Sequence, residues 1–540
     1  MLRVFNSQSK SITGAAIIIS GATLISRIMG LARDRIFAHY FGAGPIMDSY
    51  YAAFKIPDLI YNLLIIGALS AGFIPTFSKL FNQNEDKSPA WKLANNILNI
   101  TAIALLIVSF FGIIFTPILA PIIAPGFNDT SKALVITLTR IMFGSTILLG
   151  LSMVIGGILQ SLRAFFLYSL APIFYNLGII IGAIMLVPLL GTSGLAWGVV
   201  LGAFMHLSLQ TYSAYANGYK WQWYFNLKDK NARLVGKLMM PRTLGLAISQ
   251  LNLVIITVLA SLLPVGSVAI FNFANNLQAV PIGIIGIPFA LAVFPVLSMS
   301  AAKNDMEEFV KNLSSTIRQI LFLIIPCAII ILLVRAQIVR VVLGTGKFDW
   351  EATVHTADTL ALFALSLFAQ ALIPLLARAF YALSNTKTPF VVGVISELTS
   401  IIAALILMKP FGVAGLALAF SVGSTVNLII LTISLRNILK KIDGEKIFSS
   451  LYRIIIAAMA MAITIQYAKK PLASVFNQDY FLGIFGQGLV AALAGLAIYI
   501  VICYLLKVPE LLQIRDGLSS RFLLLKTKQV QTEESIETNA

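Results

Sequence analysis

Charged side chains lie inside the first long apolar segment of the chain, where they could build a polar site. Residues 13–35 contain Arg27, Arg33, Asp34 and Arg35. A charge at membrane depth costs about 2.5–3.5 kcal/mol on insertion scales, so such residues mark functional sites by default. Arg27 and Asp34 are seven residues apart and therefore share one helix face. That face is expected to point into a cavity or against another helix.

The second apolar segment, residues 48–78, repeats this pattern with mixed charge. Asp48, Lys55 and Asn62 follow one another at steps of seven. Two simpler interpretations are also open: Asp48 and Lys55 could form a structural ion pair, and Arg35 could extend outward to the membrane interface. Two helical turns are a long reach for direct pairing. We therefore expect Asp48 and Lys55 to have separate partners.

Amide side chains replace the charges in a later apolar segment, residues 268–298. This segment offers Asn272, Asn275 and Asn276 in its first half. A polar stripe facing lipid would be unstable, so these amides should also face a cavity or another helix. The charged segments near the N-terminus thus have an amide-rich counterpart.

Two other charged residues, Arg140 and Glu397, lie within apolar segments. Each either links two helices by hydrogen bonds or lines a cavity, and the sequence leaves both interpretations open. Prolines interrupt several segments and remove one backbone hydrogen bond each. A static kink is their commoner role, but Pro57 lies beside the charged residues of the second segment. We therefore select Pro57 as the candidate hinge.

Residues for catalysis, metal binding or nucleotide binding form no recognisable pattern. The three histidines have no partner at metal-ligand spacing, and both cysteines lie in apolar runs, which is typical of inert core cysteines. The run LGTGKFDW (343–350) lacks the spacing of a phosphate loop and is interpreted as a turn. We expect a protein that is not an enzyme and has neither cofactor nor metal. Any pumping would use the membrane potential or a cation gradient.

The composition excludes a soluble protein. Of 540 residues, 58% are hydrophobic and 11% are charged, whereas a globular domain has about 25% charged residues. The mean hydropathy is +0.90. Apolar runs are continuous and do not alternate, which excludes an outer-membrane barrel. The composition predicts an all-α polytopic membrane protein, because helices satisfy their own backbone polar groups in lipid.

About fourteen transmembrane helices of roughly 20 residues or more can be drawn along the chain. The expected spans are 13–35, 48–78, 93–118, 133–159, 166–187, 192–214, 239–262, 268–298, 313–334, 354–380, 388–407, 413–435, 450–467 and 480–505. Most of the 39 lysines and arginines fall in loops that share a side with the N-terminus, which places both termini in the cytoplasm. Topology thus explains the net charge of +17, and no nucleic-acid partner is expected. The basic N-terminus leads into a retained helix and not a cleaved signal peptide.

Similar motifs recur about 220 residues apart. SLRAFFLYSLAP (161–172) resembles ARAFYALSNTKTP (377–389), and GTSGLAWG (191–198) resembles GVAGLALA (412–419). Since six helices, an even number, separate the copies, the repeat predicts two six-helix lobes of the same orientation, plus two C-terminal helices. The predicted domains are an N-lobe at 1–216, a basic cytoplasmic linker at 217–242, a C-lobe at 243–436, the last two helices at 437–507 and a cytoplasmic tail at 508–540. Two such lobes are typical of a transporter with a cavity between them.

Seven motifs carry a family resemblance that covers about residues 10–505. They are SRIMGLARD (26–34), DSYYAAFKIPDL (48–59), LTRIMF (138–143), GGILQSLRAFFLYSLAPIFYN (156–176), GTGKFDWEAT (344–353), LARAFYALSNTKTP (376–389) and GVAGLALA (412–419). As a set they resemble the MurJ (MviN) family of lipid II flippases, which belongs to the multidrug/oligosaccharidyl-lipid/polysaccharide exporter superfamily. The resemblance includes the count of fourteen helices.

The resemblance implies a central cationic cavity for the diphosphate-sugar headgroup of the undecaprenyl-linked peptidoglycan precursor. It also implies a hydrophobic groove beside the last two helices for the polyprenyl tail. By motif match, Arg27, Arg33, Asp34, Asp48 and Lys55 correspond to substrate-binding residues of the family. Guanidinium groups suit this ligand, because they bind phosphate oxygens with two N–H bonds in a low-dielectric site.

One helix departs from the family pattern. The family usually has an arginine where this chain has Asn276, in an Ala-Asn-Asn-Leu run. Asn276 is therefore a candidate substrate-binding amide, and Asn62, Asn272 and Asn275 are candidate cavity residues. Either amides and the N-lobe hold the diphosphate, or the headgroup differs from that of lipid II.

Together these features predict a flippase that moves lipid II from the inner to the outer leaflet of the bacterial cytoplasmic membrane by alternating access. The alternatives are a flippase for another polyprenyl-diphosphate-linked glycan and an ion-coupled drug antiporter of the same superfamily. The expected partners are the polyprenyl-linked substrate, membrane lipids and cell-wall synthesis proteins. A monomer is expected.

Overall fold

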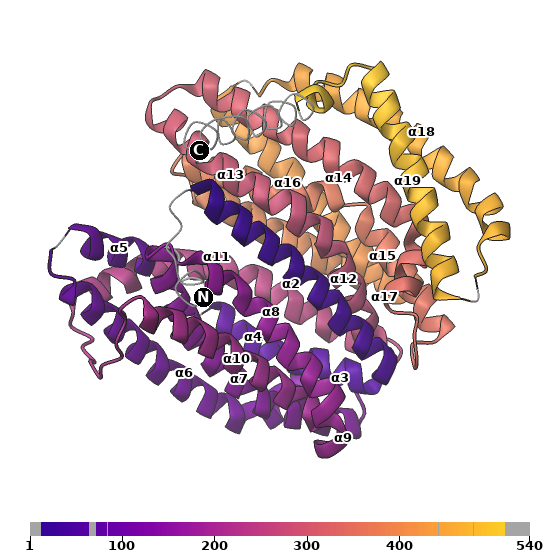
Figure 1. Ribbon diagram of the computed structural model, residues 1–540. Coiled ribbons are helices and arrows are strands. Elements are labelled where there is room, and N and C mark those ends of the chain that lie inside the picture. Colours follow the sequence, from indigo (N-terminus) through magenta and orange to yellow (C-terminus); the bar gives the residue numbers. More distant parts are fainter. Residues whose placement is uncertain (1–11, 64–71, 84, 441, 479, 514–540) are drawn as a thin grey trace, which may run out of the picture. The chain divides into compact units, whose positions relative to one another are not determined.

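The structure is a computed structural model that describes residues 12–63, 72–83, 85–440, 442–478 and 480–513, so most of the predicted tail at 508–540 lies outside it. All regular elements within these ranges are helices (Figure 1). They are α2 (Ile12–Phe41), α3 (Pro45–Ala53), α4 (Lys55–Tyr61), α5 (Ile74–Gln83), α6 (Ser88–Ile123), α7 (Asp129–Ser161), α8 (Phe165–Ile181), η3 (Gly182–Leu186), α9 (Val187–Leu190), α10 (Ser193–Ala216), α11 (Lys230–Ser261), α12 (Ser267–Pro281), η4 (Ile282–Gly286), α13 (Ile287–Ala302), α14 (Met306–Val342), α15 (Trp350–Ala364), α16 (Leu367–Ala382), α17 (Lys387–Leu439), α18 (Gly444–Val475) and α19 (Phe481–Leu505).

Nine helices of the described residues are long and apolar enough to cross a membrane, or ten if the bent pair α15–α16 is one span. Several of them expose large apolar side chains. On α6, for example, large apolar side chains are exposed from Leu106 to Ile122, including Phe110 at 61% and Ile118 at 62%. We call residues 106–122 the lipid-facing band of α6. The prediction of an all-α polytopic membrane protein is confirmed.

Two compact units divide the chain. Unit 1 comprises Met1–Leu277, Val342–Leu362 and Gly393–Gly423, and unit 2 comprises Gln278–Val341, Phe363–Val392 and Ser424–Ala540. Within unit 1, α7 packs against α6 and α10, and α8 packs against α2 and α10 (Figure 1). Within unit 2, α18 pairs with α19 and α13 packs on α16. The domain boundaries expected from the repeat stay a prediction.

Glycines bring the backbones of α8 and α10 into contact. A Cβ at Gly178 would collide with the Cα of Gly202, and a Cβ at Gly198 would lie 2.5 Å from the Cα of Gly182. Gly178 of α8 and Gly182 at the start of η3 are four residues apart, as are Gly198 and Gly202 of α10, the spacing that lets membrane helices approach closely. This packing holds α8, one of the helices of the candidate site, against the core of unit 1.

The span expected over 48–78 begins as two helices, because the chain breaks into α3 and α4 at Phe54, as the proline in this segment predicted. Pro57 accounts for the break, since it has no N–H to donate to the Ala53 carbonyl four residues earlier. Thr139 Oγ1 of α7 donates to that carbonyl instead, at 3.2 Å. The broken helix is therefore tied to α7. A hinge motion at Pro57 stays a prediction.

The longest helix, α17, combines two of the expected spans, 388–407 and 413–435. Its 53 residues would reach about 80 Å, far beyond a hydrocarbon core of about 30 Å. Gly412 has φ 56° and ψ −134°, which interrupts the helix. A residue with a side chain rarely adopts this conformation, so glycine permits the break. The expected boundary between two spans is thus present as a break and not as a loop.

Candidate functional site

Arg33 and Asp34, adjacent on α2, form the centre of the candidate site in unit 1. The Asp34 Oδ1 atom accepts hydrogen bonds from Arg33 Nε at 3.0 Å and from Nη2 at 2.8 Å. The side chain of Asp34 is 3% exposed and that of Arg33 is 21% exposed. Because the carboxylate is buried and the guanidinium is partly open, the pair presents a positive group to its accessible side.

Two amides complete this arrangement. Asn276 Nδ2 of α12 donates to Asp34 Oδ2 at 2.9 Å, and Arg33 Nη1 donates to Asn176 Oδ1 of α8 at 3.2 Å. Asn176 in turn donates to the carbonyl of Pro172, which fixes its amide. Three of the five guanidinium N–H groups are thus used, and the other two have no partner among the described residues. We call Arg33, Asp34, Asn176 and Asn276 the Arg33 cluster.

Aromatic rings pack beside the Arg33 cluster. The Arg33 guanidinium lies 5.9 Å from the ring centroid of Phe37, and Phe37 packs edge-on against Tyr50 at 5.0 Å. Tyr51 packs against Phe273 at 5.7 Å. Such rings displace water from the buried side of the cluster. The lower local dielectric strengthens the attraction between a guanidinium and an anion.

Asp48 has a structural role that the sequence did not predict. Its carboxylate is 3% exposed and accepts backbone N–H groups from Gly266 at 2.6 Å and Ala269 at 2.8 Å. These donors lie at the N-terminus of α12, where a negative group is stabilising. Asp48 therefore does not form the ion pair with Lys55 that the sequence left open, and it positions the helix that carries Asn276. A direct role of Asp48 in substrate binding stays a prediction.

Two predicted cations lie outside the cluster. Arg27 on α2 is half-buried and makes no hydrogen bond or ion pair with any described residue. Lys55 on α4 interacts electrostatically with Asp58 but has no hydrogen bond or ion pair within the described ranges. Arg35 differs, because its Nη1 donates to the carbonyl of Val342 at 3.4 Å. The donors of Arg27 and Lys55 are thus unused among the described residues, their role in substrate binding stays a prediction, and Arg35 does not extend freely outward.

Two of the three predicted cavity amides bind their own helices. Asn62 Nδ2 donates to the Asp58 carbonyl at 2.8 Å, and Asn272 Nδ2 donates to the Val268 carbonyl at 2.7 Å. Asn275 lies on α12 beside the amide that binds Asp34. None of the hydrogen bonds described for Asn62 and Asn272 reaches the Arg33 cluster. The cavity role of all three amides stays a prediction.

The two isolated charges differ from each other. Arg140 Nε of α7 donates to the Ile113 carbonyl of α6 at 3.2 Å, so this arginine links two helices. Glu397 of α17 is half-buried and makes no hydrogen bond or ion pair with another described residue. For Arg140 the structure supports the linking role, and for Glu397 both interpretations stay predictions.

Asn176 is a member of the cluster that the sequence analysis missed. It lies in the apolar run FFLYSLAPIFYNLGIII (165–181), where an amide without a partner would be costly. That cost was the available signal. A neutral amide such as Asn176 carries no charge that marks it in the sequence. It nevertheless fixes the orientation of the charged Arg33 side chain.

Within the described part of the chain, no three His, Cys, Asp or Glu side chains are grouped so that they could hold a metal ion. The buried His206 hydrogen-bonds Ser152 at 2.7 Å, which links α10 to α7. This histidine is therefore part of the helix packing.

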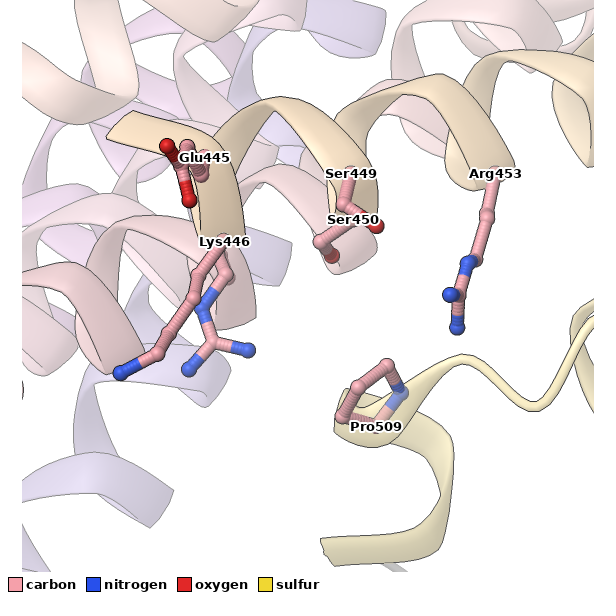
Figure 2. Close-up of a pocket in the computed structure, with 7 residues that line it drawn as sticks. Glu445, Lys446, Ser449, Ser450, Arg453 and Pro509 are labelled. Carbon is pink, nitrogen blue, oxygen red and sulfur yellow. The ribbon is translucent and has the colours of Figure 1, made fainter. Parts of the chain in front are cut away.

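Unit 2 contains a separate pocket of about 310 Å³ at the first turns of α18 (Figure 2). Its lining residues are Arg318, Glu445, Lys446, Ser449, Ser450, Arg453 and Pro509. The arginines have internal partners: Arg318 Nη1 pairs with Glu510 at 2.6 Å, and Arg453 Nη1 donates to two backbone carbonyls that follow α19. This pocket marks the junction where the chain after α19 docks on α14 and α18. The Arg33 cluster remains the candidate site.

Comparison with known proteins finds relatives along most of the chain. The family profile described as "Lipid II flippase MurJ" matches residues 37–490. The chain is 30% identical over 431 residues to the lipid II flippase MurJ of Burkholderia cenocepacia, which covers 78% of this chain and 83% of that protein. It is 27% identical over 511 residues to the probable lipid II flippase MurJ of Bdellovibrio bacteriovorus, which covers 94% and 97%.

Solved structures share the fold. A lipid II flippase MurJ in an inward closed conformation superposes with a TM-score of 0.75 at 24% identity, covering 91% of this chain and 98% of that one. An inward-facing multidrug resistance MATE family transporter of the MOP superfamily superposes with a TM-score of 0.66 at 15% identity, covering 79% and 99%. The structures establish the fold, and the profile and the relatives establish the family. The chain belongs to the MurJ family of lipid II flippases.

Proposed function

We propose that this chain moves lipid II, the undecaprenyl-diphosphate-linked peptidoglycan precursor, from the inner to the outer leaflet of the bacterial cytoplasmic membrane. Membership of the MurJ family makes the chain a transporter and not an enzyme. The observation that carries the site assignment is the Arg33 guanidinium, which is partly open and has two N–H groups without a partner among the described residues.

The chemistry of the cluster suits a diphosphate. A diphosphate that enters an apolar site must exchange its hydration shell for fixed hydrogen-bond donors. A guanidinium supplies two parallel N–H groups that match phosphate oxygens. Asp34 and Asn176 hold Arg33 in place before substrate arrives, which lowers the entropic cost of binding. Arg27 and Lys55 supply two further cations in the same unit.

The proposal includes the architecture of fourteen spans in two six-helix lobes, with both termini in the cytoplasm and alternating access between the lobes. Several observations support this count. Dividing α17 at Gly412 gives ten spans, and counting α15–α16 as one span gives eleven. The charged α2, the broken α3–α5 and α11 add three more, which makes fourteen. The N-lobe at 1–216, the linker at 217–242 and the C-lobe at 243–436 are parts of the same proposal.

In this proposal α18 and α19, within residues 437–507, serve the polyprenyl tail. The two helices pack on α14 in unit 2, where the Tyr499 hydroxyl donates to the Phe322 carbonyl at 2.8 Å. The outer side of α18 is apolar and open: Met459 is 54% exposed and Ile463 is 60% exposed. A long apolar chain could lie along such a surface without exposing it to water.

A photo-crosslinking amino acid at Ile463 is therefore expected to capture radiolabelled lipid II in native membranes. The matched control is Ile118 on the lipid-facing band of α6. It is the same residue type and is similarly exposed, at 62%, but it lies on a different helix. Capture at Ile463 should exceed capture at Ile118 at least about fivefold and should fall when unlabelled lipid II is added in excess, as specific binding saturates. Equal, unsaturable capture at both positions would show contact with bulk lipid only.

No cofactor takes part in this proposal. Transport is driven by the membrane potential or a cation gradient, and the protein acts as a monomer whose partners include cell-wall synthesis proteins. A second candidate function is a flippase for another polyprenyl-diphosphate-linked glycan. Asn276 favours it, because the amide that replaces the family's arginine is bound to Asp34 and adds no cation to the site.

A further inference from the structure

Three asparagines on α6 clamp an extended segment that follows α10. Asn95 Nδ2 donates to the Lys220 carbonyl at 3.1 Å. Asn96 exchanges two bonds with the backbone of Asn226, at 2.9 and 2.8 Å. Asn99 Nδ2 donates to the carbonyls of Gln222 and Tyr224 at 3.1 and 3.0 Å. All three asparagines are 2% exposed or less. We call residues 219–227 the clamped segment.

Side-chain bonds strengthen the clamp at its start. The Tyr219 hydroxyl donates to Asn95 Oδ1 at 2.8 Å, and the N–H of Gln222 donates to the same oxygen at 3.0 Å. Burial raises the pKa of the Tyr219 phenol, so it stays a donor at physiological pH. Buried amides that use both donors and acceptors hold a backbone in one conformation. The clamped segment is therefore ordered although it belongs to no helix.

The clamp leaves a row of large apolar side chains exposed. Trp221 is 52% exposed, Trp223 67%, Phe225 42% and Leu227 59%. These are alternate residues, as expected for an extended chain whose carbonyls at even-numbered positions face α6. A soluble surface rarely fixes four large apolar groups in one row without a partner for them.

With the lipid-facing band of α6 centred in the hydrocarbon core, helix length places the clamped segment at about the depth of lipid headgroups. Asn99 precedes Leu106, the start of the lipid-facing band of α6, by seven residues or about 10 Å. The band is about 24 Å long, so a core of about 30 Å extends about 3 Å past each end and leaves Asn99 about 7 Å outside it. The segment also begins three residues after Ala216, the end of α10. Tryptophan is enriched at this depth in membrane proteins.

Cations flank this apolar row in the sequence. Lys220, Lys228 and Lys230 are exposed, and Arg233 and Lys237 follow in the first turns of α11. The acidic residue among them, Asp229, is engaged as the N-cap of α11, where its side chain accepts from the N–H of Ala232 at 2.8 Å. Lys220, Lys228 and Lys230 form no ion pair with a described residue. Apolar rings beside such lysines are the pattern of a surface that binds anionic lipid.

We propose that the clamped segment is a preformed anchor that inserts its aromatic row among the anionic phospholipid headgroups of the leaflet it faces. The anchor is independent of the Arg33 cluster and of the transported lipid. Its clamp fixes unit 1 at a set depth, because the asparagines join the segment rigidly to α6.

Tryptophan fluorescence tests this anchor in the full-length chain. Of the five tryptophans, Trp223 is kept and the other four are replaced with phenylalanine. The protein is reconstituted in phosphatidylcholine vesicles that contain phosphatidylglycerol, with bromine on the acyl chains of one lipid or the other. Bromine on phosphatidylglycerol should quench Trp223 at least about twice as strongly as bromine on phosphatidylcholine at equal mole fraction, because cations enrich anionic lipid nearby.

Three further proteins make the result decisive. In the Trp223 protein, Lys220→Gln, Lys228→Gln and Lys230→Gln together should remove the preference for phosphatidylglycerol. A protein that keeps only Trp91, which packs against Phe77 and Phe81, should show no preference. Asn99→Ala should reduce quenching of Trp223 by at least about half, since the segment is released from α6.

Asn217→Ala is the matched control for the clamp, because the Asn217 side chain, at the C-cap of α10, donates to the Ser213 carbonyl of that helix and bonds no described residue of the clamped segment. It should leave the quenching of Trp223 unchanged. The proposal is overturned if Trp223 is quenched by aqueous iodide and not by either brominated lipid. That result would place the aromatic row in water and point to a protein partner. Quenching without preference for phosphatidylglycerol would overturn the role of the cations.

Discussion

Arg33→Ala is expected to reduce lipid II flipping by at least about 100-fold. The two N–H groups without a partner among the described residues can each form a charge-assisted bond of about 1.5–3 kcal/mol with the diphosphate. Their loss together therefore removes about 3–6 kcal/mol, and 1.4 kcal/mol corresponds to about tenfold. Arg33→Lys keeps the charge but loses the planar fork. It should be impaired about tenfold.

The measurement is flipping in proteoliposomes at matched protein content. Arg140→Ala is the matched control, since it also removes an arginine from an apolar segment but only breaks a bond to the Ile113 carbonyl. It should keep nearly full activity. Arg33→Ala also leaves the buried Asp34 carboxylate without its cation, with the Asn276 amide as its side-chain partner. A second protein therefore combines Arg33→Ala with Asp34→Asn, which removes the buried charge. If either Arg33→Ala protein flips lipid II normally, Arg33 is not in the site.

Glu510→Ala is expected to lower the free energy of unfolding by about 3–5 kcal/mol, because it leaves a buried cation unpaired. The Glu510 Oε1 atom lies 2.6 Å from Arg318 Nη1, and its Oε2 accepts from the Ser450 hydroxyl at 2.7 Å. The Glu510 side chain is 1% exposed and that of Arg318 is 13% exposed. The pair joins α14, α18 and the chain after α19. Its loss should loosen all three.

Thermal unfolding of the purified protein in detergent measures this effect. Glu510→Gln keeps the shape and one hydrogen-bond acceptor, so it should unfold at a temperature between those of wild type and Glu510→Ala. Replacing both Arg318 and Glu510 with methionine should restore most of the stability, since a well-packed apolar pair often matches a buried ion pair. An unchanged unfolding temperature in Glu510→Ala would contradict a stabilising role for this pair.

Part of the candidate site was predictable because charge inside an apolar run has few explanations. Arg33 and Asp34 stand out in the sequence on that ground alone, and the structure pairs them. Asn276 stands out as an amide in an apolar segment. Its bond to Asp34 joins positions 242 residues apart, a contact that the helix pattern does not reveal.

Other features depend on partners that have no signature in the sequence. Asp48 binds backbone N–H groups of Gly266 and Ala269, and every residue except proline carries such a group. The break before Pro57 was foreseeable from the proline. The compensating bond from Thr139 was not, because it depends on how α7 packs. Glu510 lies in the expected tail at 508–540, yet it is fully buried.

The fold, like the candidate site, was predictable in part. Continuous apolar runs predicted an all-α membrane protein, since lipid leaves the backbone no other choice. Hydropathy alone made the run at 48–78 one span, and the proline within it predicted the break between α3 and α4. The break in α17 at Gly412 was expected as a loop between spans, and the structure has instead a single glycine in a conformation that side chains disfavour.

Complementation tests the central claim, that this chain flips lipid II. A bacterium depleted of its own lipid II flippase would express this chain, and membrane insertion would be checked by blotting. The chain should restore growth and cell shape, whereas Arg33→Ala at the same level should not. If the inserted wild-type chain fails to restore growth, and lipid II accumulates in the inner leaflet of those cells, the claim is contradicted and another polyprenyl-diphosphate-linked glycan becomes the substrate to test.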